Sequence, residues 1–436
     1  MAKAHGLGRR ARRSVAALVA ASATFVLVAV PEAGAQQKNP PVNQPGVTAT
    51  QIRVGGVATV TGDPTGNTDG TAFDGTNAYF DYVNSTQGGI CGRKLVLSSK
   101  RDDMLSNNRA QVQGLLSEDN VFAVLPVATT LFTGSSLLVQ SKTPTFGWDI
   151  QADWGSEAND PGPANLFGAV GSFINFSTPG PTAFPDLFLA RKLGVKRVGV
   201  VAYNVAQSSS AADVIKATFD KYPGAGKVVV EDTSVPFGGV DYSADVARMV
   251  QAKVQFVVPT LDSNGAFLLA REMKRQGLNV PMLLSDAYNQ QRIAANAQVA
   301  NGSYVFTQFA PFETNPKPAG LQLYLTWIKK SGGQQTENSV YGWVNADLFV
   351  TGLKAAGCNF TRQKLVDAIN QLKSYNANGF IPPVNWTTAH QQGNGCFSFV
   401  KIVNGKFQPA FTQPGKPFLC IPPGSTSIPA NPQAVG

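Results

Sequence analysis

Side chains that could perform chemistry are few in this chain of 436 residues. Histidine occurs only at His5 and His390, which excludes multi-histidine metal sites and most histidine-based nucleophilic catalysis. No GxSxG motif supplies a nucleophilic serine. The segment PGAGK at residues 223–227 lacks the first glycine of a phosphate-binding loop, and Val228 follows where Ser or Thr would bind magnesium. The sequence therefore predicts a protein that is not an enzyme and that has neither a catalytic residue nor a cofactor.

A calcium site is also not expected. The segment TGNTDGTAFDGT, residues 65–76, has Asn67, Asp69 and Gly70 at the spacing of a calcium-binding loop. Threonines occupy its first and last positions, however, where the site needs Asp and Glu. We predict a polar loop at the rim of a binding cleft and no metal site.

Residues suited to recognition stand directly after apolar segments. They are hydroxyl, aromatic and carboxylate side chains: Thr59, Thr61, Asp63, Thr129, Thr130, Trp148, Asp149, Tyr203, Asn204, Asp262, Ser263, Asp286, Tyr288 and Asn289. They include no arranged acid, base and nucleophile, so they indicate ligand binding rather than turnover. Structural roles remain open: Asp286 could cap a helix, Trp148 could belong to a core, and Tyr203 could end a strand.

The elements that must position these residues alternate between strand and helix. The first unit is a strand at 52–60, a helix ended by Gly88 and Gly89, and a strand at 94–99, which predicts a right-handed crossover in a parallel sheet. Further predicted strands are 121–127, 144–148, 197–203, 227–231, 256–260 and 282–285, with helices between them at 106–117, 129–141, 183–193, 211–222, 242–251 and 265–276. This pattern predicts doubly wound α/β lobes, which bind ligands at the carboxyl ends of their strands.

The C-terminal part is predicted to hold three helices and a hairpin. The helices are 320–330, 340–356 and 361–372, and the hairpin at 397–407 contains an Asn404-Gly405 turn. The length and the hydrophobic content of 43% favour two lobes with sizeable cores.

Residues 1–35 have the pattern of an export signal. A basic segment ending at Arg13 precedes an apolar run at 15–30 and a small-residue cleavage site, AGA. The run is shorter than the ~20 residues of a membrane span. Residues 1–35 carry +4 of the net charge of +9, which leaves +5 for the rest of the chain. No long run of basic residues occurs in that remaining part, so no nucleic-acid partner is expected. The export pathway, Sec or twin-arginine, stays open.

The segment 70–103 carries a resemblance to a known family. Asn84, Gly88, Gly89, Ile90, Gly92, Arg93 and Asp102 stand as in the N-GGI-GR...D signature of type I periplasmic solute-binding proteins. Matching segments follow in the same order over residues 46–407, and the chain most resembles the branched-chain amino-acid-binding family of ABC transporters. The resemblance implies two doubly wound parallel-sheet lobes joined by three crossover segments.

The resemblance also implies where the lobes begin and end. Residues 48–167 and 308–380 are expected to form lobe I and residues 168–307 and 381–422 lobe II, with a linker at 36–47 and a flexible tail at 423–436. The long loop at 149–164 is expected to be either a lid over the cleft or a surface insertion.

Site residues follow from the same resemblance. Thr129 and Thr130 match a first-lobe turn that holds an amino acid's carboxylate in the family, whereas Asp149 departs from a second such turn and would repel an anion. Asp286 stands where the family places an acidic residue for the α-ammonium group, and Tyr203 stands near its aromatic wall. The predicted ligand-binding set is Thr129, Thr130, Gly147, Trp148, Asp149, Tyr203, Asp262, Asp286 and Tyr288.

Four cysteines in an exported chain favour two disulfides over metal ligation. In the fold implied by the resemblance, Cys91 and Cys358 lie on one lobe away from the cleft, and Cys396 and Cys420 flank a hairpin of the other. We predict these two pairs. No cysteine stands near the cleavage site, so no lipid anchor is expected.

The resemblance implies an extracytoplasmic solute-binding protein. We expect a soluble, exported monomer in the periplasm, cell envelope or medium that captures a small polar ligand, an amino acid or related compound, and delivers it to ABC permease subunits. An exported sensor of the same fold, acting on a signalling partner, is the alternative.

Overall fold

The computed structural model describes residues 40–63, 69–155, 163–172, 183–222, 224–391, 393–421 and 432–436. The predicted export signal and the first four residues of the linker lie outside these ranges. Within them, no helix is both long enough and apolar enough to cross a membrane.

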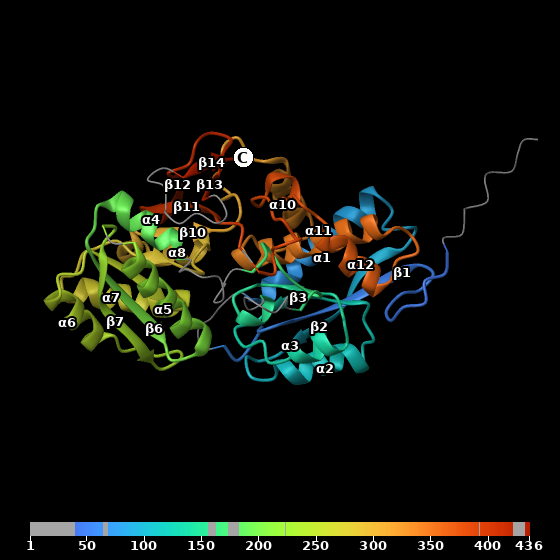
Figure 1. Cartoon of the computed structure of the whole chain (residues 1–436), viewed down its shortest axis with the longest axis horizontal. Helices are drawn as coiled ribbons and strands as arrows, with labels where there is room; N and C mark the ends of the chain where they lie inside the picture. The colour runs from blue at the N-terminus through green and yellow to red at the C-terminus, as the bar shows by residue number, and fades with distance from the viewer. Residues whose placement is uncertain are drawn as a thin grey trace, which may run out of the picture. The chain divides into compact units, whose positions relative to one another are not determined.

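Five parallel strands form the first sheet, in the order β2-β1-β3-β4-β5 (Figure 1). They are β1 (Gln51–Ala58), β2 (Lys94–Asp102), β3 (Ala123–Ala128), β4 (Thr145–Gly147) and β5 (Leu166–Gly168). Every residue of β3 is buried, as expected for a parallel strand covered on both faces.

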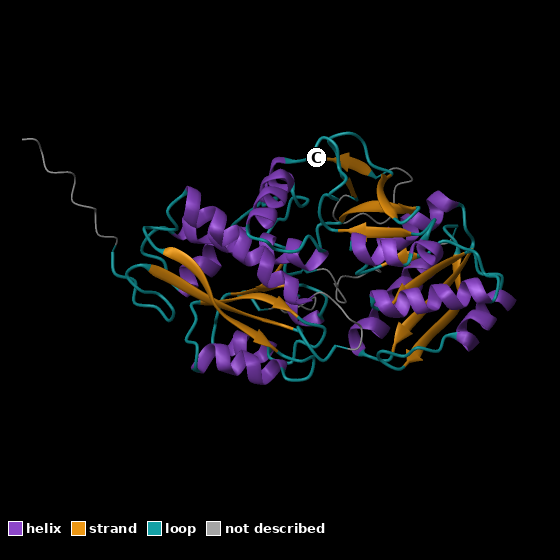
Figure 2. Cartoon of the chain, turned by 180° about the vertical axis from the view of Figure 1, so that it is seen from behind, coloured by secondary structure: helices purple, strands orange, loops and turns teal. Residues whose placement is uncertain are grey.

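Helices cover both faces of this sheet (Figure 2). They are α1 (Ala72–Thr86), α2 (Asn108–Ser117), α3 (Ser135–Gln140), α10 (Ala319–Lys330), α11 (Glu337–Ala356) and α12 (Arg362–Asn370), with short helices η1 (Asp69–Thr71), η2 (Ala152–Trp154) and η3 (Ala377–Gly379). We call the sheet with these helices the first lobe. Its last three α-helices come from the C-terminal part of the chain, so the chain leaves the lobe and returns to it.

The second lobe contains a three-stranded parallel sheet and a six-stranded mixed sheet. The parallel sheet has the order β7-β6-β8, and a bridge from Val257 to Met282 links it to the edge of the mixed sheet, β14-β13-β11-β10-β9 with β12 paired to β11. Their strands are β6 (Arg197–Tyr203), β7 (Lys227–Val235), β8 (Phe256–Thr260), β9 (Leu283–Leu284), β10 (Tyr304–Thr307), β11 (Cys396–Val403), β12 (Lys406–Ala410), β13 (Phe418–Cys420) and β14 (Gln433–Val435).

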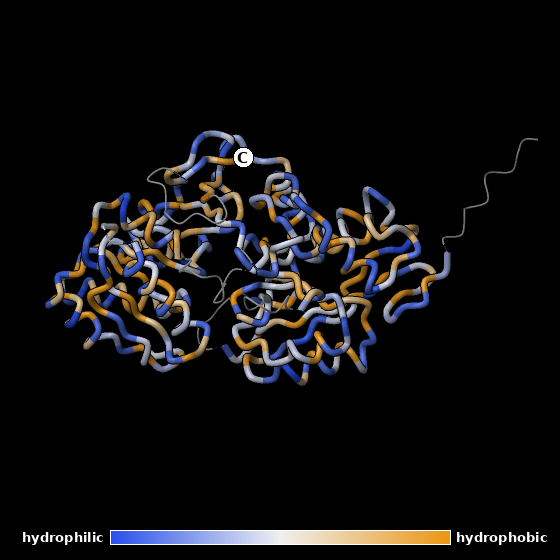
Figure 3. Tube along the Cα trace, viewed as in Figure 1, coloured by the Kyte–Doolittle hydropathy of each residue, from blue (hydrophilic) through white to orange (hydrophobic). Residues whose placement is uncertain are grey.

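The helices of the second lobe are α4 (Phe184–Leu193), α5 (Ala206–Lys221), α6 (Ser243–Gln251), α7 (Ser263–Arg275), α8 (Gln290–Ala295) and α9 (Ala297–Ala300). Hydrophobic residues concentrate along the central strands of both lobes (Figure 3). The predicted doubly wound α/β class is confirmed, and so is the β11–β12 hairpin, whose turn residues Asn404 and Gly405 both have positive φ.

Three predicted elements differ from the structure. The helix predicted from residue 129 begins only at Ser135, because the Gln151 amide donates hydrogen bonds to the carbonyls of Thr129 and Thr130 and holds that turn as a loop. Helix α11 begins three residues earlier than predicted, since a capping box joins Thr336 and Ser339. The tail predicted to be flexible contains β14, which pairs with β13.

The described part of the 149–164 loop packs on the first lobe. Trp154 is 1% exposed and stacks on Phe132 at 4.9 Å between ring centroids. Its Nε1–H donates to Gln151. Residues 156–162 lie outside the described ranges.

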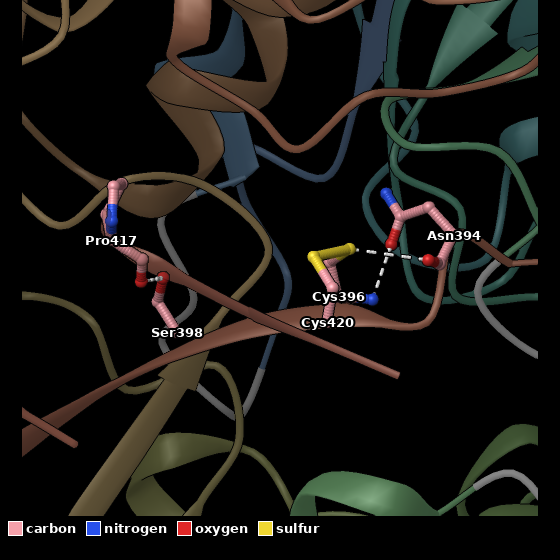
Figure 4. The surroundings of a disulfide bond; sticks show 5 residues. All are labelled: Asn394, Cys396, Ser398, Pro417 and Cys420. Carbon is pink, nitrogen blue, oxygen red and sulfur yellow. Dashed lines mark hydrogen bonds between the residues drawn. A yellow bond between two sulfur atoms is a disulfide. The ribbon is translucent and has the colours of Figure 1, made fainter. Parts of the chain in front are cut away.

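Both predicted disulfides are present, and no described cysteine is free. Cys91 pairs with Cys358 across 267 residues of sequence. Cys396 and Cys420 stand directly opposite each other on the antiparallel strands β11 and β13. The Asn394 side chain accepts a hydrogen bond from the Cys396 backbone N–H (Figure 4).

Helices α1 and α11 approach each other closely enough for their backbones to touch. A Cβ on Gly75 would lie 1.8 Å from the Ser339 carbonyl oxygen, and one on Gly342 would lie 2.0 Å from the Ala72 carbonyl oxygen. The Thr76 hydroxyl donates to the Gly342 carbonyl across the same contact. Only glycine fits at these two positions.

This contact predicts that a methyl group added at Gly342 destabilises the protein more than one added at Gly352 on the same helix. We expect Gly342→Ala to lower the free energy of unfolding by about 2 to 3 kcal/mol, because rigid backbone must move apart. The control is Gly352→Ala on the same helix, where the new Cβ meets only side chains of Ile369 and Leu365. We expect it to cost less than Gly342→Ala, because side chains move aside more readily than backbone and alanine favours the helix. Equal losses in urea denaturation would contradict the backbone contact.

A carboxyl group is buried behind β4. Asp149 is 1% exposed. A Cβ added to Gly168 would lie 2.4 Å from the Asp149 Cβ, so the two residues pack closely. Burial raises the pKa of Asp149 from 3.8 to about 7, although the backbone N–H groups of Asp149 and Val170 partly offset the shift. The folded protein therefore holds a proton here that the unfolded chain releases above pH 4.

Because the pKa of Asp149 is higher in the folded protein than in the unfolded chain, the free energy of unfolding falls as the pH rises from about 4 to about 7. The slope for one such group is at most about 1.4 kcal/mol per pH unit. We expect Asp149→Asn, which keeps the shape and cannot ionise, to raise the free energy of unfolding by about 1 to 3 kcal/mol at pH 8 and to leave it nearly unchanged at pH 4. Urea denaturation at both pH values measures this, with the exposed Asp213→Asn as control. A variant no more stable than the native protein at pH 8 would refute the buried, protonated Asp149.

Candidate ligand-binding site

A cavity of about 250 Å³ is lined by residues of both lobes. The first lobe contributes Thr130 after β3, Trp148 and Ile150 after β4, and Glu337 and Tyr341 from α11. The second lobe contributes the ends of β6, β8 and β9 and parts of α4 and α5. The cavity thus lies at the carboxyl ends of parallel strands, where doubly wound sheets bind ligands.

Most of the cavity wall is apolar. The lining side chains without polar atoms are Ile150, Ala183, Pro185, Val205, Ala211, Val214, Ile215, Phe237, Val258, Pro259, Leu261, Leu283 and Phe306. Two aromatic residues of the first lobe, Trp148 and Tyr341, stack with ring centroids 6.4 Å apart. Such a wall suits a ligand with an apolar or aromatic body.

All charged residues in the described lining are acidic. They are Asp186, Asp262, Asp286 and Glu337, and the described lining contains no Lys, Arg or His. Burial raises the pKa of Asp186 to about 7. The site therefore favours a cationic or hydrogen-bond-donating group on the ligand over an anionic one.

Asp262 is committed to the protein's own structure. One of its oxygens accepts from the backbone N–H groups of Asn264 and Gly265 and so caps α7. Its other oxygen accepts from the Tyr203 hydroxyl at 2.5 Å. These contacts orient the Tyr203 ring at the cavity wall and leave Asp262 little capacity for a ligand.

Asp286 is half-buried and follows β9 in a left-handed backbone conformation, with φ of 49°. This conformation is uncommon outside glycine, asparagine and aspartate. Burial raises its pKa well above the ordinary value, and repulsion from Glu337 is the largest charge effect that adds to the shift. Arg292 only partly offsets it, and this guanidinium donates to Ser263.

Glu337 is the first residue of α11 and is 9% exposed. Its Oε1 accepts from the Tyr341 hydroxyl at 3.0 Å, and the Tyr288 backbone N–H also donates to this carboxyl group. Burial raises its pKa to about 7.

One hydrogen bond joins the two lobes beside the cavity. The Gln207 amide, on α5, donates to the Thr130 carbonyl of the first lobe at 2.8 Å. Both residues line the cavity, so this contact forms only when the lobes meet.

The structure brings five of the nine predicted site residues to the cavity: Thr130, Trp148, Tyr203, Asp262 and Asp286. The other four, Thr129, Gly147, Asp149 and Tyr288, do not line this cavity. The Thr129 hydroxyl contacts the Thr59 hydroxyl at 3.2 Å, and a side chain on Gly147 would collide with the Val127 carbonyl. Asp149 faces the lobe interior because successive residues after a strand alternate in direction.

Tyr288 is the fourth residue outside the cavity. It is 2% exposed, donates from its hydroxyl to Glu313 at 2.6 Å and accepts from the Phe312 N–H. It packs among aromatic side chains of the fold.

Eight polar lining residues were not in the predicted set: Asp186, Gln207, Ser208, Thr260, Ser285, Gln308, Glu337 and Tyr341. Five of them lie in the first two turns of helices α4, α5 and α11, whereas Thr260 ends β8 and Ser285 and Gln308 follow β9 and β10. For α11 the signal was present, since Thr336 and Ser339 form a capping box that places Glu337 in the first turn.

Comparisons with known proteins agree with this architecture. A family model described as "Periplasmic binding protein" matches residues 51–406. A fatty acid ABC transporter substrate-binding protein from Thermomonospora curvata has 21% identity and a TM-score of 0.67, covering 84% of this chain and 93% of its own. A branched chain amino acid ABC transporter from Thermus thermophilus with bound valine has 18% identity and a TM-score of 0.66, with coverages of 83% and 95%.

A further similar structure is a solute binding protein of an ABC transporter from R. palustris in complex with benzoate. It has 17% identity and a TM-score of 0.65, covering 82% of this chain and 95% of its own. The search of curated proteins finds no match. Because the family model spans most of the chain and the fold and cavity agree with it, the chain belongs to the periplasmic binding protein family.

Proposed function

We propose that this protein is an extracytoplasmic solute-binding protein that captures a small ligand, an amino acid or related compound, and delivers it to the permease of an ABC transporter. The observation that supports this most directly is one cavity lined by the strand ends of both lobes. The names of the similar structures, all solute-binding components of ABC transporters, support the transport role.

Binding by two lobes gives the ligand control over the conformation. A ligand that touches Trp148 on the first lobe and Tyr203 on the second makes its full set of contacts only when the lobes are closed. It therefore binds the closed state more tightly and increases the population of that state. The permease would recognise the closed form.

In this proposal, the polar group of the ligand binds to the carboxyl group of Asp286. This carboxyl group lines the cavity, and the described lining contains no Lys, Arg or His to pair with it. The aromatic and aliphatic wall would take the apolar body of the ligand. Thr130 is the one residue of the predicted carboxylate-binding turn that reaches the cavity.

A thermal-shift screen of amino acids, amides, amines, small carboxylates and aromatic acids tests the proposed function. A ligand that binds only the folded protein raises its melting temperature. We expect at least one class of small solute to do so, and to be recovered chemically unchanged after incubation. Conversion of the solute into a product would contradict the binding role.

For a hit that carries an ammonium group, we expect Asp286→Asn to weaken binding ten- to a hundredfold, about 1.5 to 3 kcal/mol, through loss of the charge-assisted hydrogen bond. Asparagine tolerates the left-handed conformation, so the backbone should be preserved. Calorimetry with the native protein, this variant and Asp213→Asn, which removes the same charge from an exposed position on α5, measures the effect. Equal affinity in all three would remove Asp286 from the ligand.

A further inference from the structure

We propose that the second lobe takes the apolar part of the ligand into its own interior, and that the ligand is an elongated amphiphile. Such a ligand has a hydrogen-bonding head group without negative charge and an apolar chain longer than the side chain of leucine. The inference rests on the proposed function and names the ligand class of the same cavity. We call the part of the cavity inside the second lobe the inner chamber, lined by Ala183, Pro185, Asp186, Ala211, Val214, Ile215, Val258 and Leu283.

One face of α5 lines the cavity along most of the helix. Its lining residues repeat at intervals of three and four and so share that face: Gln207, Ser208, Ala211, Val214 and Ile215. Gln207 marks the interlobe end, because its amide donates to the Thr130 carbonyl of the first lobe. From residue 207 to residue 215 the helix rises about 12 Å. The cavity therefore extends from the interface of the lobes well into the second lobe, and its α5 wall changes from polar to apolar on the way.

Strands β8 and β9 supply a second wall with the same change. Val258 on β8 and Leu283 on β9 stand level with each other, because the residues just before them form a parallel bridge. Both belong to the hydrophobic cluster that contains Ile215. Two residues later, on the same face of the sheet, come the hydroxyls of Thr260 and Ser285. The wall is therefore apolar inside the lobe and polar at the opening between the lobes.

The start of α4 lies at the far end of the inner chamber. The Ala183 N–H donates to the Thr218 hydroxyl, in the last turn of α5, at 3.2 Å. Pro185 and Asp186 line the chamber from the first turn of α4. Burial raises the pKa of Asp186 to about 7, so the uncharged form predominates at pH 6. At that pH the far end holds no charge that opposes an apolar chain.

The opening of the chamber suits the head group. The hydroxyls of Thr130 and Ser285 and the amide of Gln308 line the cavity and make no hydrogen bond within the described part of the chain. Each of them can both donate and accept. The described lining contains no cationic side chain to pair with a carboxylate. An amide or alcohol head therefore fits this opening better than an anionic one.

The length of the chamber decides the length of the ligand's chain. An extended chain advances about 1.2 Å per bond, because a residue of three backbone bonds spans 3.3–3.6 Å. A chain of eight carbons reaches roughly 10 Å on this scale, close to the stretch of α5 that lines the cavity. The side chain of leucine reaches roughly 4 Å and would leave most of the apolar wall uncovered. Covering that wall is the main source of affinity in this proposal.

A series of primary amides tests the chain length. Calorimetry at pH 6 would compare octanamide, hexanamide, butanamide and leucine, with the weaker ligands measured by competition against octanamide. We expect one octanamide to bind per protein, and affinity to rise about fourfold per methylene, the ~0.8 kcal/mol of a buried CH₂. Octanamide should then bind at least about fiftyfold more tightly than butanamide.

Equal affinities along the series, or tighter binding of leucine than of octanamide, would overturn the inference and leave the solute-binding function standing. Failure of all three amides to bind would also overturn it, while the thermal-shift screen decides the function separately.

The variant Ala211→Phe tests where the chain lies. Ala211 is half-buried on the lining face of α5, and a phenyl ring there would fill the inner chamber. We expect octanamide to bind at least tenfold more weakly, whereas butanamide, which stays at the opening, should change less than threefold. The control is Ala217→Phe, which adds the same ring at an exposed position of the same helix and should leave both affinities native. An unchanged affinity for octanamide in Ala211→Phe, or an equal loss for both amides, would place the chain outside the chamber.

The variant Val214→Ala makes the same test by removing bulk. It takes two methyl groups from the half-buried lining of α5, so native-like thermal unfolding is expected. We expect a threefold or greater loss of affinity for octanamide through the lost apolar contact and no change for butanamide. Native affinity for octanamide in this variant would contradict a chain that lies along α5.

Discussion

The backbone contact between α1 and α11 is the constraint on which the rest of the structure depends. Gly75 and Gly342 let two helices from distant parts of the sequence approach within touching distance. This contact holds α11 on the first lobe, between the two stretches of chain that build the second lobe. It also sets where α11 begins relative to the strand ends. Glu337 and Tyr341 lie just before Gly342, so helix packing and cavity composition are parts of one arrangement.

The cavity combines low polarity with unbalanced negative charge. Apolar walls raise the free energy of any charged carboxyl group inside, and they strengthen the attraction of such a group for a cation. A protein that only needed stability would avoid this combination. In the proposed binding role, a ligand that pairs with these groups would stabilise the closed state relative to the same state without ligand.

Much of the fold was predictable from the sequence because alternating strands and helices leave a strong periodic signal, as in the fully buried β3. The positions of Trp148, Tyr203 and Asp286 at the cavity were predictable because each ends or follows a strand. The direction of each side chain was not predictable, and Asp149 and Tyr288, which also follow strands, do not line the cavity. Glu337 and Tyr341 were missed because no local pattern shows that α11 returns to the cavity. The cysteine pairs were predicted only through the family resemblance, since the number of cysteines alone permits three pairings.

The disulfide between Cys91 and Cys358 has a topological consequence. It closes a covalent ring that contains most of both lobes, including the chain's passage into the second lobe and back. A single cut by a protease anywhere within this ring leaves one molecule, which separates into fragments only after reduction. The ring also cannot close until residue 358 has been synthesised, so covalent locking of the first lobe comes late in the maturation of the chain.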